Sequence, residues 1–311
     1  MSQTEVFPTM ITPYHAGGSI DYSTAEQYVQ WYYDKGCTGI FSLCQSSEIF
    51  FMTLEERVRL NRVVWRKALQ IREKYGKPFT IISSGHISDT IEDQIRELRA
   101  VAESGTDVLV FITNRLDPQN QGDDVWISNA ERLLDALPAE LPLGLYESPY
   151  PYKRLVTDRI LTWCRSTGRF RYMKDTCCNA AVIKHRNELL QGSGFRLLNA
   201  NCQTLLDSLK NGGGGYCGIM ANFHPELYVW LCSHYLEMPE KAELLQALLG
   251  TAGFTENGLP YPLTAKYHMC LEGIPTVNHS RSCKDEALTP YVRACVEQMR
   301  LLCKTAAQML P

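Results

Sequence analysis

Residues 143–176 read LGLYESPYPYKRLVTDRILTWCRSTGRFRYMKDT, and this stretch contains the repeating unit of the fold. A short apolar run, Leu143–Tyr146, precedes a helical pattern over Thr157–Ser166, and a second run, Tyr172–Lys174, follows it. Two short apolar runs joined by a helix-length connection are typical of parallel strands with a helical crossover. The stretch therefore predicts one strand–helix–strand unit of an α/β protein.

The same alternation continues in both directions along the chain. The other predicted strands are Val6–Ile11, Gly39–Leu43, Phe79–Ser83, Val108–Ile112, Phe195–Leu198 and Gly215–Ile219. The other helices expected between strands are Ser23–Lys35, Thr53–Tyr75, Ser88–Ser104, Val125–Leu137, Ala180–Gln191 and Thr204–Asn211. Eight such units favour a closed (β/α)8 TIM barrel over an open doubly wound sheet. No GxGxxG motif follows the first strand, which argues against a dinucleotide-binding fold.

The chain after about residue 222 has a different pattern, with helices and no strands between them. The helices predicted there are Pro225–Glu237, Glu240–Thr251, Leu263–Leu271 and Pro290–Met309. We therefore expect a barrel domain over residues 1–224 and a C-terminal helical extension over residues 225–311. In the barrel, Ser23 or Thr24 is the expected cap of the first helix, and Thr53 with Glu56 has the pattern of a capping box.

Length and composition exclude several classes of protein. The 311 residues suit one barrel with an appendage, and a formal net charge of −3 gives no reason to expect a nucleic-acid partner. Neither a run of 18 apolar residues nor a secretory signal pattern is present, so we expect a cytoplasmic protein that makes no membrane contact. The twelve cysteines are scattered, which favours reduced thiols. The seven histidines have no HxxxH or HExxH spacing, so no metal site is expected.

Two side chains end neighbouring predicted strands, at the edge where barrel enzymes carry their chemistry. Lys174 ends one strand, and Tyr146 ends the strand before it. A lysine at a barrel mouth is desolvated, which disfavours the ammonium and predicts a nucleophilic amine near neutral pH. A neighbouring phenol can move protons to and from a carbinolamine. The alternative for Lys174 is a structural salt bridge with Asp175 or another carboxylate.

Two loops allow a functional and a structural interpretation. The segment Cys44–Glu48, with the sequence CQSSE, offers hydroxyl and backbone N–H groups that can hold a carboxylate, although polar loop residues are usually only solvated. The four glycines Gly212–Gly215 allow another backbone to approach closely. They form either a turn before the last strand, which is favoured, or a loop that faces the substrate.

Seven short motifs follow one another in a specific order and spacing, although none is specific alone. They are Thr9–Pro13, Gly18–Asp21, Gly39–Ile40 leading to Glu48, Leu54–Arg57, Tyr146–Pro149, Met173–Asp175, and Gly212–Gly215 with Ala221-Asn222. In this order the sequence resembles the dihydrodipicolinate synthase / N-acetylneuraminate lyase family of class I pyruvate-dependent aldolases. The resemblance runs from Phe7 to about residue 225.

The resemblance implies roles for individual residues. Lys174 would form an imine with pyruvate or another 2-oxo acid, and Tyr146 would relay protons. The loop at Gln45 and Ser46 would bind the carboxylate of the 2-oxo acid, and Cys217 joins them as a substrate-binding candidate. No cofactor is implied besides the covalent imine. The resemblance also implies a homo-oligomer, commonly a tetramer built as a dimer of dimers.

The chain departs from the family pattern where the family binds its second substrate. Gln45 stands where the loop usually has its first threonine, Thr113–Asp117 lacks the tyrosine of the synthases, and Pro151 falls at the position of an arginine. These changes argue against lysine biosynthesis, and the missing serine-threonine pair argues against sialic acid cleavage. The residues left to meet a polar or acidic tail of another 2-oxo acid are Gln45, Asn114, Arg115, Lys153 and Arg154.

Three functions remain open from the sequence. The favoured one is a Schiff-base lyase, aldolase or dehydratase that acts on a 2-oxo-3-deoxy or 4-hydroxy-2-oxo acid. The second is authentic 4-hydroxy-tetrahydrodipicolinate synthase, which joins pyruvate to aspartate semialdehyde. The third is a non-catalytic homologue that binds a 2-oxo acid without turnover.

Overall fold

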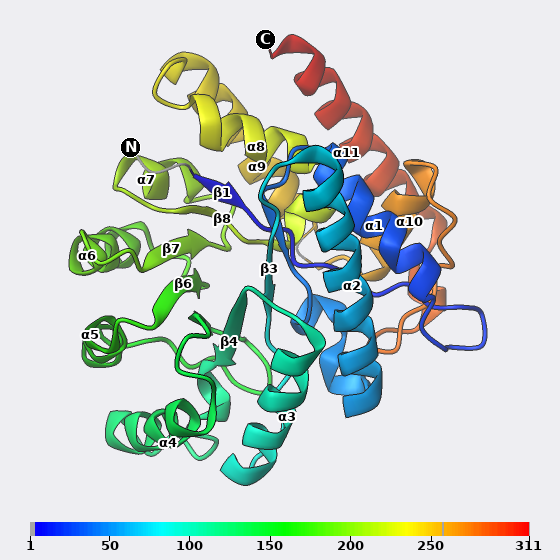
Figure 1. The fold of residues 1–311 in the computed structure, drawn as a ribbon. Coiled ribbons are helices and arrows are strands. Elements are labelled where there is room, and N and C mark those ends of the chain that lie inside the picture. Colours follow the sequence, from blue (N-terminus) through cyan, green and yellow to red (C-terminus); the bar gives the residue numbers. More distant parts are fainter. Residues whose placement is uncertain (1–3, 257, 311) are drawn as a thin grey trace.

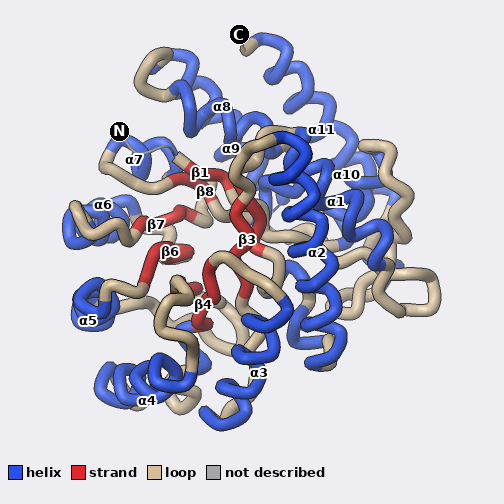
Figure 2. The backbone as a smooth tube through the Cα atoms, in the orientation of Figure 1, coloured by secondary structure: helices blue, strands red, loops and turns tan. Residues whose placement is uncertain are grey.

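Eight parallel strands form one barrel in the computed structural model, which describes residues 4–256 and 258–310. Neighbouring strands pair in the order β1-β8-β7-β6-β5-β4-β3-β2, and helices surround them (Figure 1, Figure 2). The strands are β1 (Glu5–Val6), β2 (Gly39–Phe41), β3 (Thr80–Ser83), β4 (Val108–Ile112), β5 (Leu143–Tyr146), β6 (Phe170–Asp175), β7 (Arg196–Asn199) and β8 (Gly215–Tyr216). The helices that alternate with them are α1 (Tyr22–Asp34), α2 (Leu54–Tyr75), α3 (Ile91–Ser104), α4 (Asp123–Ala136), α5 (Asp158–Thr167), α6 (Ala180–Leu190), α7 (Leu205–Lys210) and α8 (Pro225–His234). The predicted (β/α)8 architecture is confirmed.

The barrel closes between β1 and β2 through the residues that follow β1. Thr9 forms a parallel bridge with Phe41, and the backbone N–H of Phe41 donates to the carbonyl of Pro8 at 2.9 Å. Pro8 has no N–H to donate, so it interrupts the ladder between β1 and its neighbours. For this reason β1 is shorter than the predicted strand Val6–Ile11.

The four glycines before β8 allow close approach of backbone to backbone. A β-carbon on Gly215, whose φ is +136°, would lie 1.9 Å from the carbonyl oxygen of Glu5 in the paired strand β1. A β-carbon on Gly213 would lie 2.4 Å from the hydroxyl oxygen of Ser208. Only glycine fits such positions. The close packing supports the interpretation of this run as a turn before the last strand.

Helix capping agrees with the sequence for α2 and differs for α1. The hydroxyl of Thr53 accepts the N–H of Glu56 at 3.2 Å, and the Glu56 carboxylate accepts the N–H of Thr53 at 3.0 Å, so the capping box is confirmed. In α1, however, Asp21 is the cap, since its carboxylate accepts the N–H of Thr24 at 3.0 Å. The prediction of Ser23 or Thr24 was wrong because α1 begins earlier, and a carboxylate is a strong acceptor at a helix N-terminus.

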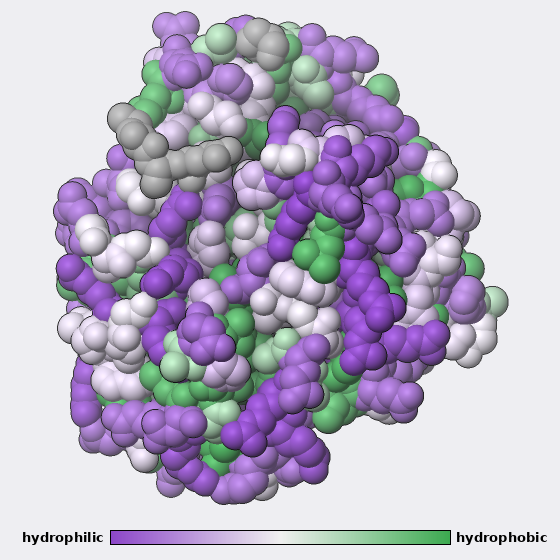
Figure 3. All heavy atoms as spheres, in the orientation of Figure 1, coloured by the Kyte–Doolittle hydropathy of each residue, from purple (hydrophilic) through white to green (hydrophobic). Residues whose placement is uncertain are grey.

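Three more helices follow α8, namely α9 (Pro239–Glu256), α10 (Leu263–Leu271) and α11 (Pro290–Met309). Helix α8 packs against β1 and β8 as well as against α9 and α11, so it belongs to the ring of barrel helices and also contacts the extension. The domain boundary between residues 224 and 225 therefore stays a prediction. Within the described residues, no helix has the length and apolarity needed to cross a membrane. The face of the molecule in Figure 3 is mostly hydrophilic.

Candidate active site

Lys174 and Tyr146 lie side by side at the carboxyl ends of β6 and β5. The two residues are paired in the strand register, so their side chains leave adjacent strands at the same level. The Lys174 amine lies 4.3 Å from the centre of the Tyr146 ring and 5.6 Å from the centre of the Phe41 ring. Both side chains are buried. A primary amine and a phenol thus share one desolvated environment.

The salt-bridge alternative for Lys174 does not hold. The Asp175 carboxylate pairs with the Arg186 guanidinium and accepts the N–H of Cys177 at 2.8 Å. Arg186 also pairs with Glu147 at 2.9 Å, which completes a buried carboxylate–guanidinium–carboxylate group. Among the described residues, no carboxylate lies within ion-pair distance of the Lys174 amine. The two neighbouring carboxylates are therefore bound to Arg186, and neither pairs with the Lys174 amine.

The protonation of Lys174 differs from the prediction. Burial lowers the pKa of the amine, but Tyr146, Cys217 and Cys44 and a hydrogen bond with Tyr146 raise it more, so the pKa lies above its usual value. The ring face of Tyr146 also stabilises an ammonium. The expectation of a lowered pKa was wrong because desolvation was considered without these neighbours. At neutral pH the amine is therefore an ammonium.

The partners of Lys174 are themselves protonated at neutral pH. Burial raises the pKa of Tyr146, although the nearby Lys174 opposes this shift. Burial also raises the pKa of the Cys217 thiol to about 12. Tyr146 is therefore a phenol that can donate a proton, and it becomes a good acceptor only when it has given its own proton away.

These residues open into a cavity of about 650 Å³ at the carboxyl end of the barrel. A cavity of this size holds a small organic acid with room for a larger tail. Its walls combine the lysine and tyrosine with polar and aromatic side chains from several loops. The lining residues include Gln45, Ser46, Glu48, Phe50, Phe51, Tyr150, Lys153, Thr176, Asn201, Tyr261 and Ser282.

The loop after β2 has the position expected of it. Ser46 is buried in the cavity wall, and its hydroxyl donates to the Thr9 hydroxyl at 3.0 Å. Gln45 is exposed at the cavity, with its side-chain oxygen 3.5 Å from the Ser148 hydroxyl. Ser47 holds the loop in place, because its hydroxyl donates to the carbonyls of Met10 and Ser42, each at 2.7 Å.

Glu48 connects this loop to the C-terminal part of the chain. It has a left-handed backbone with φ of 63°, and its carboxylate forms a fully buried ion pair with Lys266 at 2.7 Å. The same carboxylate accepts the Ser280 hydroxyl at 2.6 Å and the N–H of Ser282 at 2.9 Å. The C-terminal segment is thereby fixed against the barrel mouth, where Ser282 lines the cavity.

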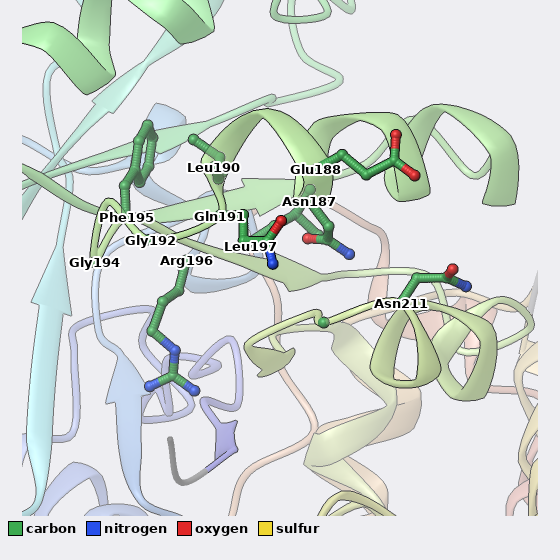
Figure 4. A pocket seen from close by; sticks show the side chains of 11 residues that line it. Asn187, Glu188, Leu190, Gln191, Gly192, Gly194, Phe195, Arg196, Leu197 and Asn211 are labelled. Carbon is green, nitrogen blue, oxygen red and sulfur yellow. The ribbon is translucent and has the colours of Figure 1, made fainter. Parts of the chain in front are cut away.

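A second cavity, of about 630 Å³, lies at the opposite ends of the strands (Figure 4). It is lined by the end of α6 and the start of β7, with Asn187, Arg196 and Asn211 among its side chains. Arg196 pairs with Glu5 at 3.2 Å. In TIM barrels the amino-terminal face of the strands serves stability, so we do not place the chemistry there.

Comparison with known proteins finds similarity to one family. A model of the dihydrodipicolinate synthetase family matches residues 2–70. The 4-hydroxy-tetrahydrodipicolinate synthase of Haloarcula marismortui is 24% identical over 222 residues, which cover 71% of this chain and 68% of the relative. The synthase of Saccharophagus degradans is 21% identical over 289 residues, covering 85% of this chain and 94% of the relative.

The chain is therefore similar to the dihydrodipicolinate synthetase family. Solved structures of the family have the same fold. A prophage protein of E. coli K12, in complex with pyruvate, superimposes with a TM-score of 0.83 at 19% identity and 99% coverage of both chains. A putative family protein from Coccidioides immitis gives a TM-score of 0.81 at 18% identity, with coverage of 98% of this chain and 97% of the other. The predicted resemblance to this family is confirmed.

Three of the residues proposed to meet a substrate tail lie elsewhere. Arg115 pairs with Asp89, outside the cavity. Arg154 pairs with Asp117 at 2.9 Å and with Asp123 at 3.1 Å. Each guanidinium therefore has a structural partner that it would have to leave in order to reach a substrate.

The third of these residues, Asn114, is buried and donates to the carbonyls of Ser148, Tyr150 and Tyr152, which hold the loop after β5. The other two substrate-binding candidates, Lys153 and Cys217, differ in their position relative to the cavity. Lys153 lines the cavity and its amine donates to the Thr176 carbonyl. Cys217 is fully buried; it acts electrostatically on the Lys174 amine and does not line the cavity.

One residue of the cavity wall could not be predicted from the sequence. Tyr261 precedes α10 and lies in the cavity wall. Its hydroxyl accepts from the Asn222 amide at 2.9 Å and is hydrogen-bonded to Ser46 and Thr9. Burial raises its pKa well above the usual value of a phenol. Because it comes from a segment far from the barrel motifs, only the structure brings it to Ser46.

Proposed function

We propose that the chain is a Schiff-base lyase or aldolase in which Lys174 forms an imine with pyruvate or a related 2-oxo acid. The proposal rests above all on the contact of the Lys174 amine with the Tyr146 ring, 4.3 Å from its centre, inside a cavity at the carboxyl end of the barrel. A buried amine beside a phenol, with no carboxylate partner among the described residues, suits attack on a carbonyl.

The reaction then follows from ordinary imine chemistry. The Lys174 nitrogen, once deprotonated, attacks the C2 carbonyl, and Tyr146 gives a proton to the oxygen that leaves as water. The positive imine withdraws electrons from C3, so loss of a C3 proton gives an enamine. The enamine forms a C–C bond with a second carbonyl compound, or the same bond breaks in reverse. Water finally hydrolyses the imine and restores the free amine.

Ser46 is the group that we propose for the substrate carboxylate. Its hydroxyl lies in the cavity wall and is held by Thr9 and Tyr261. Two neighbours fix the position of this hydroxyl, and it donates to an anion once its single proton turns from Thr9 toward the carboxylate. Gln45 stands beside it and offers an amide N–H, in the place where the family usually has a hydroxyl.

Trapping with borohydride tests the proposal directly. Incubation of the full chain with pyruvate and borohydride should attach a reduced pyruvyl group to Lys174, identified by peptide mass spectrometry. Lys174→Arg keeps the charge and should give no adduct, whereas Lys153→Arg should be labelled like the wild type. A folded protein whose Lys174 stays unmodified would reject the proposal.

A second candidate is authentic 4-hydroxy-tetrahydrodipicolinate synthase, because curated relatives carry that name. Against it stand Arg115 and Arg154, which pair with aspartates and leave no guanidinium in the described cavity wall. A coupled assay with pyruvate and aspartate semialdehyde decides between the two, and a rate at background removes the synthase. A non-catalytic homologue would show the adduct on Lys174 without turnover of any 2-oxo acid in a broad panel.

Two further parts of the proposal concern partners. No cofactor is needed, since the imine itself serves as the electron sink. A homo-oligomer, a dimer or a tetramer, is the expected assembly, and sedimentation equilibrium measures it.

A further inference from the structure

Three aromatic side chains line the cavity away from the strands. Phe50 and Phe51 follow β2, and Tyr150 follows β5; together they are termed the aromatic lip. The rings of Phe50 and Tyr150 meet edge-on with their centres 4.7 Å apart, so the lip joins the two loops. Phe51 and Tyr150 are 51% and 52% exposed. Large apolar side chains that stay exposed beside a cavity favour an apolar ligand there.

The polar side chains of the same wall already have partners inside the protein. The Asn201 amide donates to Gln203 at 2.7 Å, and its oxygen accepts from Thr204 at 3.0 Å. Ser282 donates its hydroxyl to Glu48 at 3.1 Å, and Thr176 donates its hydroxyl to a carbonyl at 2.8 Å. A polyhydroxylated tail would have to replace these bonds, because polar groups that enter a cavity need their own partners.

The charges of the wall are also mostly neutralised. Glu48 is held by Lys266 and by the segment around Ser280, so its carboxylate is not free for a substrate. Lys174 is the amine that forms the imine. Lys153 is then the single cation of the described wall that can meet a charged tail, and it donates to the Thr176 carbonyl. An acidic aldehyde would therefore meet one exposed lysine, whose amine is already bonded to a carbonyl, and no guanidinium in the described wall.

The described wall thus offers few free partners to a charged or polyhydroxylated tail. Its exposed aromatic rings favour an apolar tail. We propose that the second reactant carries a flat apolar tail that lies against the aromatic lip, and that its class is the aromatic aldehydes. The inference rests on the proposed imine of Lys174. An aromatic ring stacks on the lip edge-on or in offset geometry, and it needs no hydrogen bond from the wall.

The reaction balances as an aldol addition. The enamine carbon C3 attacks the aldehyde carbonyl carbon, one C–C bond forms, and the carbonyl oxygen takes a proton to become a hydroxyl. Hydrolysis of the imine consumes the water that its formation released. Pyruvate and the aldehyde thus give a 4-aryl-4-hydroxy-2-oxobutanoate, and cleavage of that acid runs through the same steps in reverse.

The test compares three aldehydes of different chemistry with the wild-type chain and pyruvate. Benzaldehyde represents the flat apolar tail, glyceraldehyde the polyol, and succinic semialdehyde the acid. Product formation followed by liquid chromatography should give a kcat/KM for benzaldehyde at least about 10-fold above the other two, because one well-filled apolar contact discriminates by this order.

Two variants and one control assign the preference to the lip. Phe50→Ala and Tyr150→Ala should each lower kcat/KM for benzaldehyde by about 10-fold, mostly through KM, and leave the residual rate with glyceraldehyde nearly unchanged. Tyr291→Ala removes an aromatic ring that is 73% exposed on α11, away from the cavity, and should change none of the rates. Borohydride labelling of Lys174 by pyruvate should be equal in all four proteins.

Several results would overturn the inference. A higher kcat/KM for glyceraldehyde or succinic semialdehyde contradicts it, and so does an equal loss for all aldehydes in the two lip variants. A changed oligomeric state in Phe50→Ala and Tyr150→Ala, without a change in aldehyde preference, assigns the lip to contact between subunits. Wild-type protein that pyruvate cannot label rejects the proposed function itself, whereas labelled protein without the preference rejects this inference alone.

Discussion

The two ends of the barrel strands carry cavities of nearly equal volume and different chemistry. The cavity at the carboxyl ends measures about 650 Å³ and contains the buried pair Lys174 and Tyr146. The cavity at the amino ends measures about 630 Å³ and contains amides and Arg196, which is paired with Glu5 (Figure 4). Volume therefore does not identify a reactive site. A buried nucleophile whose charge no carboxylate balances does so, because the fold tolerates such a group only at a cost.

The largest expected effect on turnover distinguishes the cavity at the carboxyl ends of the strands from the cavity at their amino ends. Lys174→Ala removes the nucleophile and should lower kcat by about 10⁴-fold or more, since covalent catalysis fails without it. Asn211→Ala in the other cavity should leave kcat within about 2-fold, because it removes one exposed amide. Steady-state assays of both variants with the best aldehyde measure the contrast, and strong activity in Lys174→Ala would break it.

The next largest effect concerns Tyr146. Tyr146→Phe should lower turnover by about 10²- to 10³-fold, because the proton donor is lost. The same change removes two causes that raise the pKa of Lys174, so that pKa should fall. The pH profile of borohydride trapping should then shift to lower pH, whereas turnover stays low. A trapping profile that shifts to higher pH, or that does not shift, contradicts the pairing of the two residues.

Acid should lower the free energy of unfolding of the whole protein, and this effect should not be specific to either cavity. Burial lowers the pKa of His86 to about 4 and the pKa values of His224 and His268 to about 3. The unfolded chain, with ordinary histidine pKa values near 6.5, binds more protons than the folded one below that pH, so stability falls as the pH drops. Glu256 acts oppositely, because burial raises its pKa to about 7. The combined effect of the three histidines exceeds that of Glu256. The free energy of unfolding should therefore fall by about 2 kcal/mol or more between pH 7 and pH 5.

Urea unfolding at the two pH values measures this loss. None of the three histidines lines the cavity at either end of the strands, so activity per folded molecule should not follow the loss of stability. A free energy of unfolding that rises toward pH 5 would show that Glu256 outweighs the histidines.

The smallest effect should come from Tyr261. Tyr261→Phe removes the hydroxyl bonded to Ser46, and one lost hydrogen bond of this kind corresponds to about 10-fold. We expect KM for pyruvate to rise by that factor, with a smaller change in kcat. Tyr267→Phe removes a hydroxyl on α10 that pairs with Glu297 outside the cavity, and it should leave KM unchanged. An unchanged KM in Tyr261→Phe would remove Ser46 from the carboxylate site.

The barrel could be predicted from the sequence because each of its units is local. The apolar run Leu143–Tyr146 and its neighbours along the chain have lengths and spacing that only a strand–helix repeat explains. Lys174 and Tyr146 could be found because strand ends of a parallel barrel lie at one edge. Both inferences use distances along the chain, which the sequence contains.

The rest of the site depends on distances through space. The pairing of Arg115 with Asp89, and of Arg154 with Asp117, removes both arginines from the cavity, and their charge alone gave no sign of it. The pKa of Lys174 has the opposite direction from the prediction because several neighbours, Tyr146 among them, act against burial. Side-chain partners of this kind become visible only once the chain has folded.

The buried ion pair of Glu48 with Lys266 has a consequence for how the protein is made. Lys174 and Tyr146 leave the ribosome long before Tyr261 and Ser282, which form part of the same cavity wall. A nascent chain that stops short of Lys266 already has both reactive side chains, and it lacks the cation that neutralises Glu48. The cavity wall around the imine is therefore complete only after the segment that contains Tyr261, Lys266 and Ser282 has been synthesised and has docked.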